Sequence, residues 1–219
     1  MLSVLCAGAG PALASCADPP GPGVDWTACE KVRLVLRGAN FAGARLAGAD
    51  FSGTDLQRAN LTGADLTHAS VDRARLAGAD LSRARLLQLN AYRANMAGTR
   101  LVGADLTKAE LTRTNLSSAD LSHANLRKAE LQRANLQGSK LDDANLAGAD
   151  LARTNLRGAS VAGARMALAR TFRTRLEGVD LSSVTGLTPA QLQSACGDAT
   201  TRLPSGFRQP ASWPCGREE

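Results

Sequence analysis

The chain has 219 residues, 44% of which are hydrophobic, and a formal net charge of +6. It contains only two Trp, one Tyr and four Phe, which excludes an aromatic platform for stacking single-stranded nucleic acid. Its apolar stretches fall short of the about twenty residues that span a bilayer, so the sequence predicts no transmembrane helix. The excess of Lys and Arg permits contact with anionic partners.

The first fourteen residues, MLSVLCAGAGPALA, are apolar and end in small residues around Leu13. This ending is typical of a signal-peptide cleavage site, although no Lys or Arg precedes the apolar run. We therefore predict a signal peptide at 1–14 and a periplasmic or secreted protein that begins at Ser15. Two alternatives stay open. The sequence from Leu13 to Cys16 resembles a lipoprotein signal, which would anchor the protein through a lipid on Cys16, and an uncleaved chain would be cytoplasmic.

Two segments flank the repetitive part of the chain, and each contains a close pair of cysteines. We predict caps at 15–35, with Cys16 and Cys29, and at 186–219, with Cys196 and Cys215. Cleavage after residue 14 would remove the fifth cysteine, Cys6. An even number of cysteines, placed as one pair at each end, predicts two local disulfides, which are typical of oxidising compartments.

The segment 36–185 repeats with a period of five residues. Every fifth position from Leu36 to Leu181, the centre of its unit, holds Leu or a substitute for it, and the residue two places earlier is usually Ala, Thr or Ser. A period of five fits neither the 3.6 residues of a helical turn nor the alternation of a strand. Since each unit buries only one large and one small side chain, it cannot fold alone, and stacked coils of a solenoid are the remaining architecture.

The outward positions give the length of one coil. Arginines recur every twenty residues two places after a centre, and Asn95, Asn115, Asn135 and Asn155 recur at the same interval one place before a centre. Twenty residues make four units, so we predict a four-sided coil, and thirty units give seven and a half coils. Extrapolated backwards, the register places Trp26 inward, as a plug on the first coil.

Two units depart from this register. Leu89 takes the small inward position and Ala91 the large one, which predicts a local bulge. Near the C-terminal end, Thr171 takes the place of the central Leu, and Phe172 falls at an outward position. We expect either a shift of that coil by one residue or a contact between Phe172 and the C-terminal tail.

The segment after the repeats carries the signals of a short helix. Thr188 is the expected N-cap, Pro189 the first helical residue and Gln191 the residue that completes a capping box. Gly197 is the expected end of the helix. The apolar residues Leu187, Leu192, Ala195 and Trp213 are expected to cover the last coil.

Units such as ADLTK, AELTR, TNLSS, ADLSH, ANLRK and AELQR resemble the pentapeptide-repeat family. The resemblance covers residues 36–185 and implies an all-β solenoid, the right-handed quadrilateral β-helix. The flanks, with SCADPPGPGVDWTAC before the repeats and PASWPC after them, are similar to those of exported bacterial members. The resemblance implies no specific activity, because most members of the family have none assigned.

The strongest surface feature is a column of six arginines at intervals of twenty residues, which we call the arginine ladder: Arg73, Arg93, Arg113, Arg133, Arg153 and Arg173. Glu110, Glu130 and Asp150 stand three residues before members of the ladder and are expected to neutralise them in part. One interpretation of the ladder is a solvated, partly ion-paired face. The alternative is a binding ridge for an acidic protein or a polyanionic envelope component.

Some cytosolic proteins of the family that the chain resembles mimic DNA with a negative surface and bind a topoisomerase. The repeats here contain twenty-one Lys and Arg against fourteen Asp and Glu, which is the opposite sign. We therefore keep a cytosolic, topoisomerase-interacting protein only as the alternative function, and we expect no nucleic acid as partner. End-to-end self-association of the solenoid is a further possibility that the sequence leaves open.

No catalytic, cofactor or metal site is predicted. His68 and His123 lie in different units, and neither has a Cys or a second His at ligand spacing. No nucleophile elbow and no glycine-rich loop between a strand and a helix are present. The sequence therefore predicts a non-catalytic scaffold that acts through its surface.

Overall fold

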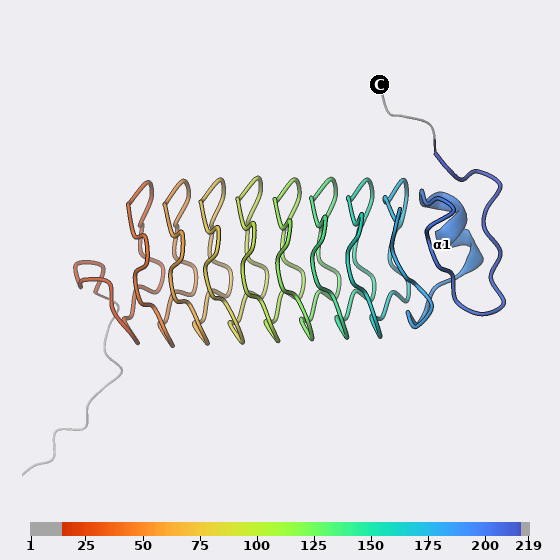
Figure 1. Cartoon of the computed structure of the whole chain (residues 1–219). Coiled ribbons are helices and arrows are strands. Elements are labelled where there is room, and N and C mark those ends of the chain that lie inside the picture. The colour runs from red at the N-terminus through yellow and green to blue at the C-terminus, as the bar shows by residue number, and fades with distance from the viewer. Residues whose placement is uncertain (1–14, 216–219) are drawn as a thin grey trace, which may run out of the picture.

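The computed structural model describes residues 15–215 and shows a four-sided rod of stacked coils with one helix at its C-terminal end (Figure 1). Single parallel β-bridges connect residue i with residue i+20 from Asp25 to Thr185, with one exception, the pair Ser160 and Asp180. The predicted coil of twenty residues is therefore confirmed. The series of β-bridges begins at Asp25, so the coiled backbone starts earlier in the chain than the repeat pattern does. The predicted signal peptide at 1–14 lies outside the described residues.

Each unit turns a corner through a β-turn that starts at its central residue. In a typical unit the Ala119 N–H donates to the Leu116 oxygen at 3.1 Å, and Ser118, the third residue of the turn, has a φ of 56°. The Leu116 N–H donates to the Asn135 oxygen of the next coil at 2.7 Å. Because each unit donates and accepts between coils, it is stable only within the stack.

The Asp or Asn that precedes most centres satisfies a backbone donor of the turn. The Oδ1 atom of Asp65, for example, accepts hydrogen bonds from Thr67 N at 3.0 Å and from Thr67 Oγ1 at 2.6 Å. Asp and Asn favour this local bond to a backbone group two residues later. The recurrence of these two residue types therefore has a structural cause before any functional one.

The interior is a continuous column of Leu and Ala, and it absorbs the exchange at Leu89 and Ala91. Both side chains are buried, and the β-bridge between Asn90 and Glu110 shows that the coils keep their regular pairing here. The predicted bulge is wrong, because swapping a large and a small side chain conserves the packed volume. The neighbouring buried Thr114 keeps its hydroxyl satisfied by donating to the Ala91 oxygen at 2.7 Å.

The N-terminal end of the core is covered as the register predicts. Trp26 is buried and packs on Phe41, with ring centroids 5.3 Å apart. The Lys31 Nζ atom lies 3.6 Å from the centroid of the Trp26 ring and donates to the Cys16 oxygen at 2.6 Å. Cys16 and Cys29 form the predicted disulfide, which ties this segment to the first coil.

The helix α1 (Pro189–Ser194) begins with the predicted capping box. Thr188 Oγ1 accepts from Gln191 N at 3.3 Å, and the Gln191 side chain accepts from Thr188 N at 2.8 Å. The predicted end at Gly197 is wrong, because α1 ends at Ser194 and Ala195 is its C-cap. Gly197 has another role: a Cβ at this position would overlap the ring of Trp213.

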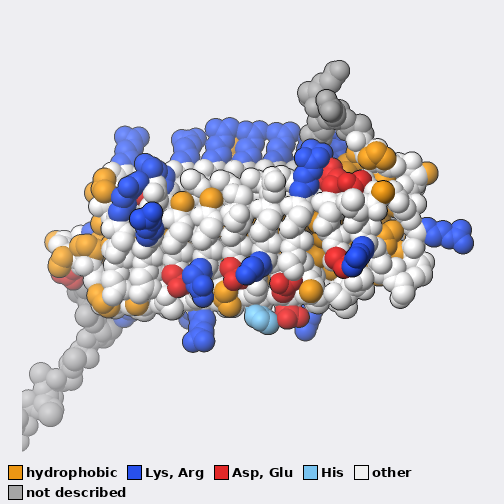
Figure 2. All heavy atoms as spheres, in the orientation of Figure 1, with side chains coloured by type: hydrophobic (Ala, Val, Ile, Leu, Met, Phe, Trp, Pro, Cys, Tyr) orange, Lys and Arg blue, Asp and Glu red, His pale blue; other side chains and the backbone are white. Residues whose placement is uncertain are grey.

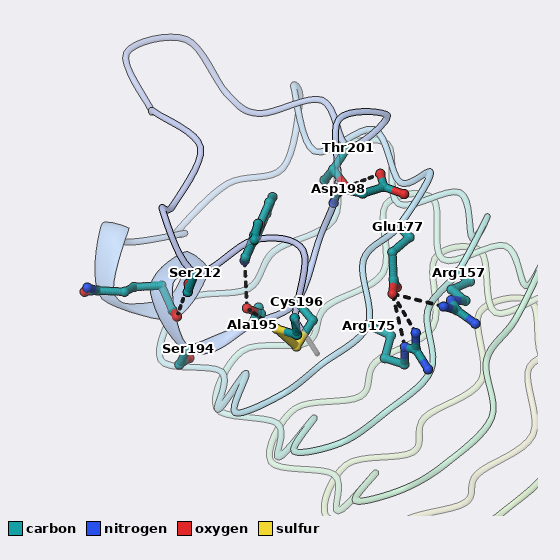
Figure 3. The surroundings of a disulfide bond; sticks show 12 residues. Arg157, Arg175, Glu177, Ser194, Ala195, Cys196, Asp198, Thr201 and Ser212 are labelled. Carbon is teal, nitrogen blue, oxygen red and sulfur yellow. Dashed lines mark hydrogen bonds and ion pairs between the residues drawn. A yellow bond between two sulfur atoms is a disulfide. The ribbon is translucent and has the colours of Figure 1, made fainter. Parts of the chain in front are cut away.

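The C-terminal tail completes the stack instead of lying loosely over it. Parallel bridges between Arg175 and Cys196 and between Asp180 and Arg202 continue two sides of the coil (Figure 1). Trp213 is buried, and its Nε1 atom donates to the Ala195 oxygen at 2.7 Å. The disulfide between Cys196 and Cys215 holds the tail there (Figure 3).

One carboxylate on the outer surface is held ionised by the coils around it. Burial alone would raise the pKa of Asp55. However, the hydrogen bond from Arg37 at 2.6 Å, the bond from Gln57 N and the charge of Arg75 together lower this pKa below its ordinary value of 3.8. A carboxyl group whose pKa is lower in the folded than in the unfolded protein contributes stability above the unfolded value, and this contribution is lost as the pH falls.

We therefore expect Asp55→Asn to lower the unfolding temperature at pH 7. The free-energy difference should be no more than about 1 kcal/mol, because both arginine partners are about half exposed. The difference from the unchanged protein should shrink as the pH falls below 3.8, where Asp55 becomes protonated in both states. Thermal unfolding followed by circular dichroism between pH 7 and pH 2 checks this, and a difference that grows towards acid pH would contradict it.

Candidate anion-binding surface

The arginine ladder forms one edge of the four-sided rod. All six arginines are exposed and occupy the third position of stacked β-turns, so that successive guanidinium groups project from successive coils. Figure 2 shows a row of Lys and Arg side chains along the upper edge of the molecule. Stacked coils are about 4.8 Å apart, which sets the repeat of the ladder.

The structure adds one residue to this edge that the sequence analysis missed. Arg33 has the same positive φ as the ladder arginines, at 56°, and lies two coils before Arg73. Gly53 occupies the position between them. Backward extrapolation of the register also reaches Arg33, but the centre of its unit is Lys31 instead of Leu, and the unit lies within the predicted cap 15–35.

The backbone of the ladder adopts a conformation that favours glycine. The φ angles of its six arginines lie between 53° and 60°, in the left-handed region, which costs about 1–2 kcal/mol for a residue with a Cβ. The next edge of the rod has Gly78, Gly98, Gly138 and Gly158 at the equivalent positions. The fold therefore does not require arginine at these corners, where any residue with a Cβ is strained, as it is at the non-glycine corners of the other three edges.

The predicted neutralisation of the ladder by Glu110 and Glu130 is wrong. Within the described part of the chain, no carboxylate oxygen lies within 4.0 Å of a guanidinium nitrogen of Arg113 or Arg133. The acidic side chains lie in the bridge column of the flat face, whereas the arginines project from its corner. Asp150 instead pairs with Arg170 at 3.0 Å and accepts from Gln132 at 3.0 Å.

Two aromatic side chains lie beside the ladder. The guanidinium carbon of Arg93 is 5.1 Å from the Tyr92 ring centroid, and those of Arg153 and Arg173 are 5.9 and 6.0 Å from the Phe172 ring centroid. The ring of Phe172 is about half exposed. The coil at Phe172 keeps its register, because Thr171 is buried in the central position and donates to the Gln191 oxygen at 2.7 Å.

The described residues show no cluster of three His, Cys, Asp or Glu side chains that could hold a metal ion. His68 and His123 are both exposed, and His123 Nδ1 lies 3.7 Å from Asp143 Oδ2 on another edge of the rod. Among residues 15–215, no helix has the length and apolar character needed to cross a membrane.

The strain in the ladder leads to a prediction about stability. Arg113→Gly should raise the unfolding temperature, with a gain of up to about 1 kcal/mol, because glycine adopts a positive φ without a steric cost. The matched control is Gly98→Ala on the next edge, where an added Cβ would meet nothing within 4 Å. This control should lose about 1 kcal/mol through backbone strain alone. Thermal unfolding of both variants checks the pair, and a destabilised Arg113→Gly protein would contradict it.

Comparison with known proteins places the chain in a family. The family model for pentapeptide repeats matches eight copies, within residues 35–71, 59–96, 72–107, 94–133 and 129–167. No curated protein sequence matches the chain.

Three solved structures show the range of similar proteins. HetL, a pentapeptide-repeat protein involved in regulating heterocyst differentiation in the cyanobacterium Nostoc sp. strain PCC 7120, is 28% identical, with 79% of this chain and 84% of HetL covered and a TM-score of 0.48.

QnrB1, a plasmid-mediated fluoroquinolone resistance protein, is 17% identical, with 84% of this chain and 91% of QnrB1 covered and a TM-score of 0.46. A pentapeptide-repeat protein from the thylakoid lumen of Arabidopsis thaliana is 24% identical, with 62% of this chain and 81% of that protein covered and a TM-score of 0.34. The repeat model covers more than half of the chain. The protein belongs to the pentapeptide-repeat family and forms its right-handed quadrilateral β-helix.

Proposed function

We propose that this protein is a non-catalytic, exported scaffold that binds an acidic or anionic partner through the arginine ladder. The observation that carries the proposal is the ladder itself. Six exposed arginines stand in register on one edge, in a backbone conformation that disfavours them. Like charges about 4.8 Å apart in water repel by about 0.8 kcal/mol for each neighbouring pair. A bound anion would remove that repulsion.

The two disulfides support export. Disulfides persist in oxidising compartments such as the periplasm or the extracellular space. The bond between Cys16 and Cys29 also argues against the lipid anchor, because a thioether-linked lipid and a disulfide cannot share the Cys16 sulfur. The cytosolic, topoisomerase-interacting alternative has less support, since the repeats have an excess of seven positive charges.

Binding through the ladder is tested by replacing Arg93, Arg113 and Arg133 together with Gln. We expect earlier elution from an immobilised heparin column and a smaller salt dependence of binding. The magnitude of the slope of log K against log salt should fall by roughly 2 to 3, because each contact with an anionic group releases about one counterion when it forms and three such contacts are lost. Retention of the triple variant at the unchanged salt concentration would contradict the proposal.

The matched control replaces Arg58, Arg83 and Lys128 with Gln. These three residues are exposed, have φ angles of 56° to 58° and lie on the three other edges of the rod, one on each. The control loses the same charge from the same backbone conformation, without touching the ladder. If both triple variants elute alike, net charge and not the ladder determines retention.

Export is tested by the intact mass of the mature protein from its native host, alkylated with and without prior reduction. We expect a chain that begins at Ser15 and has four thiols that react only after reduction. A lipid on Cys16 would show the anchored form instead. A chain that retains Met1 with free cysteines would contradict export and favour the cytosolic alternative.

A further inference from the structure

The ladder separates two faces of the rod. The face away from Glu110, Glu130 and Asp150 contains no acidic residue over four successive coils. We call it the amide face and define it as residues 95–98, 115–118, 135–138 and 155–158, which begin with Asn95, Asn115, Asn135 and Asn155. On four successive coils a ladder arginine stands two residues before one of these asparagines. In Figure 2 a pale band without acidic side chains lies directly below the row of basic side chains and ends at charged groups on both sides.

The amide face presents hydrogen-bond donors, because the asparagine oxygens are already used. Asn115 Oδ1 accepts from Ser117 N at 3.2 Å and from Asn135 Nδ2 at 3.3 Å, and Asn135 Oδ1 accepts from Gln137 N and Asn155 Nδ2 in the same way. A carbonyl oxygen with two such bonds has no lone pair left. Asn115 and Asn135 each donate only one of their two amide hydrogens to another described residue, whereas Asn155 Nδ2 donates to Asn135 Oδ1 and Gln137 Oε1. The second hydrogen of Asn115 and of Asn135 remains available to a ligand.

The two sides of the ladder therefore differ in what they can bind. On the preceding face, the bridge column contains Glu110, Glu130 and Asp150, which would repel an anion. In the same columns beyond the two ends of the amide face lie the carboxylates of Asp55 and Glu177, and arginines pair with both of them. Figure 3 shows Glu177 held between Arg157 and Arg175. Because carboxylates on the preceding face would repel it, an anionic ligand that contacts the ladder should lie over the amide face.

We propose that the ladder and the amide face together bind an unbranched acidic polysaccharide of the polyuronate type, lying parallel to the axis of the rod. Such a chain presents one carboxylate and free hydroxyl groups on each sugar ring, which are the two kinds of group that the ladder and the amide face can bind. Carboxylates would pair with guanidinium groups and hydroxyl oxygens would accept from the asparagine amides. This inference rests on the proposed function and adds the class of ligand and the face on which it lies.

Other linear polyanions fit this surface less well. Binding of single-stranded nucleic acid relies on aromatic stacking, and the amide face has no aromatic side chain. An extended acidic peptide alternates its carboxylates between two faces, about 6.6 Å apart on each, and it carries no hydroxyl groups beside them. A polyuronate carries a carboxylate and hydroxyl groups on every ring, so it can use the guanidinium groups and the asparagine amides together.

The test replaces Asn95 and Asn135 with Asp. The new carboxylates keep the acceptor that the turns need, as Asp65 shows in its own unit, and these two positions lie two coils apart. The matched control is Asn40→Asp with Asn145→Asp. These asparagines lie on the two faces that do not adjoin the ladder, and their Oδ1 atoms accept from Ala42 N at 3.1 Å and Ala147 N at 3.2 Å. Both double variants change the net charge equally.

Binding of polygalacturonate oligomers is measured by isothermal titration at fixed low salt. We expect Asn95→Asp with Asn135→Asp to weaken binding about tenfold, since two carboxylates near the ligand oppose binding by about 1.4 kcal/mol in a watery environment. The control pair should stay within about twofold of the unchanged protein. Unfolding temperatures of both variants, measured in parallel, confirm that each is folded.

Three outcomes would overturn the inference. Equal weakening by both double variants would mean that the amide face is not the binding surface. Tighter binding of charge-matched polyglutamate or oligothymidylate than of polygalacturonate would identify an acidic protein or a nucleic acid as the class of ligand. If the ladder variant loses heparin retention but neither double variant affects polygalacturonate, the proposed function stands and this inference fails. Failure of the ladder variant to change retention would instead contradict the proposed function itself.

Discussion

Backbone hydrogen bonds between coils hold this protein together, and outward side chains are largely free of that task. The Asn115 N–H donates to Ala94 in the coil before, and the Leu116 N–H donates to Asn135 in the coil after. This connection requires a large and a small inward side chain and a corner with a positive φ in each unit. It places few demands on the residue type at the corners or on the flat faces. Columns of different chemistry can therefore run along the rod without altering its shape.

The repeated constraint explains how much of the fold the sequence predicts. The period of five and the interval of twenty indicated the four-sided coil, and a local rule, the capping box at Thr188, indicated the start of α1. The errors lie where distant parts of the chain meet. The sequence around Gly197 resembles a helix end, but the reason for glycine there is the ring of Trp213, which leaves no room for a Cβ. Leu89 and Ala91 each break the pattern, yet together they fill the core.

The candidate site was predictable as a column and not as a surface. Spacing alone placed the ladder arginines on one edge. The expected ion pairs with Glu110 and Glu130 were wrong, because a separation of three residues in this fold joins a flat face to a corner and not two neighbouring side chains. The use of the asparagine oxygens also depends on the next coil, twenty residues away. Bonds of this kind cannot be inferred from a single unit.

The choice of residues at the corners bears on whether the ladder has a function. Every corner needs a positive φ, and on the edge after the ladder glycine meets this need at Gly78, Gly98, Gly138 and Gly158, whereas Arg58 and Ser118 meet it there with a Cβ. The ladder edge has arginine in its place, against both the steric cost of a Cβ and the mutual repulsion of the guanidinium groups. Carboxylates that could offset this repulsion are present, but Glu110 and Glu130 make no ion pair with the ladder, and the amide face has none. At Arg113 and Arg133, where no carboxylate oxygen of a described residue lies within 4.0 Å, the proposed anionic partner would offset both terms.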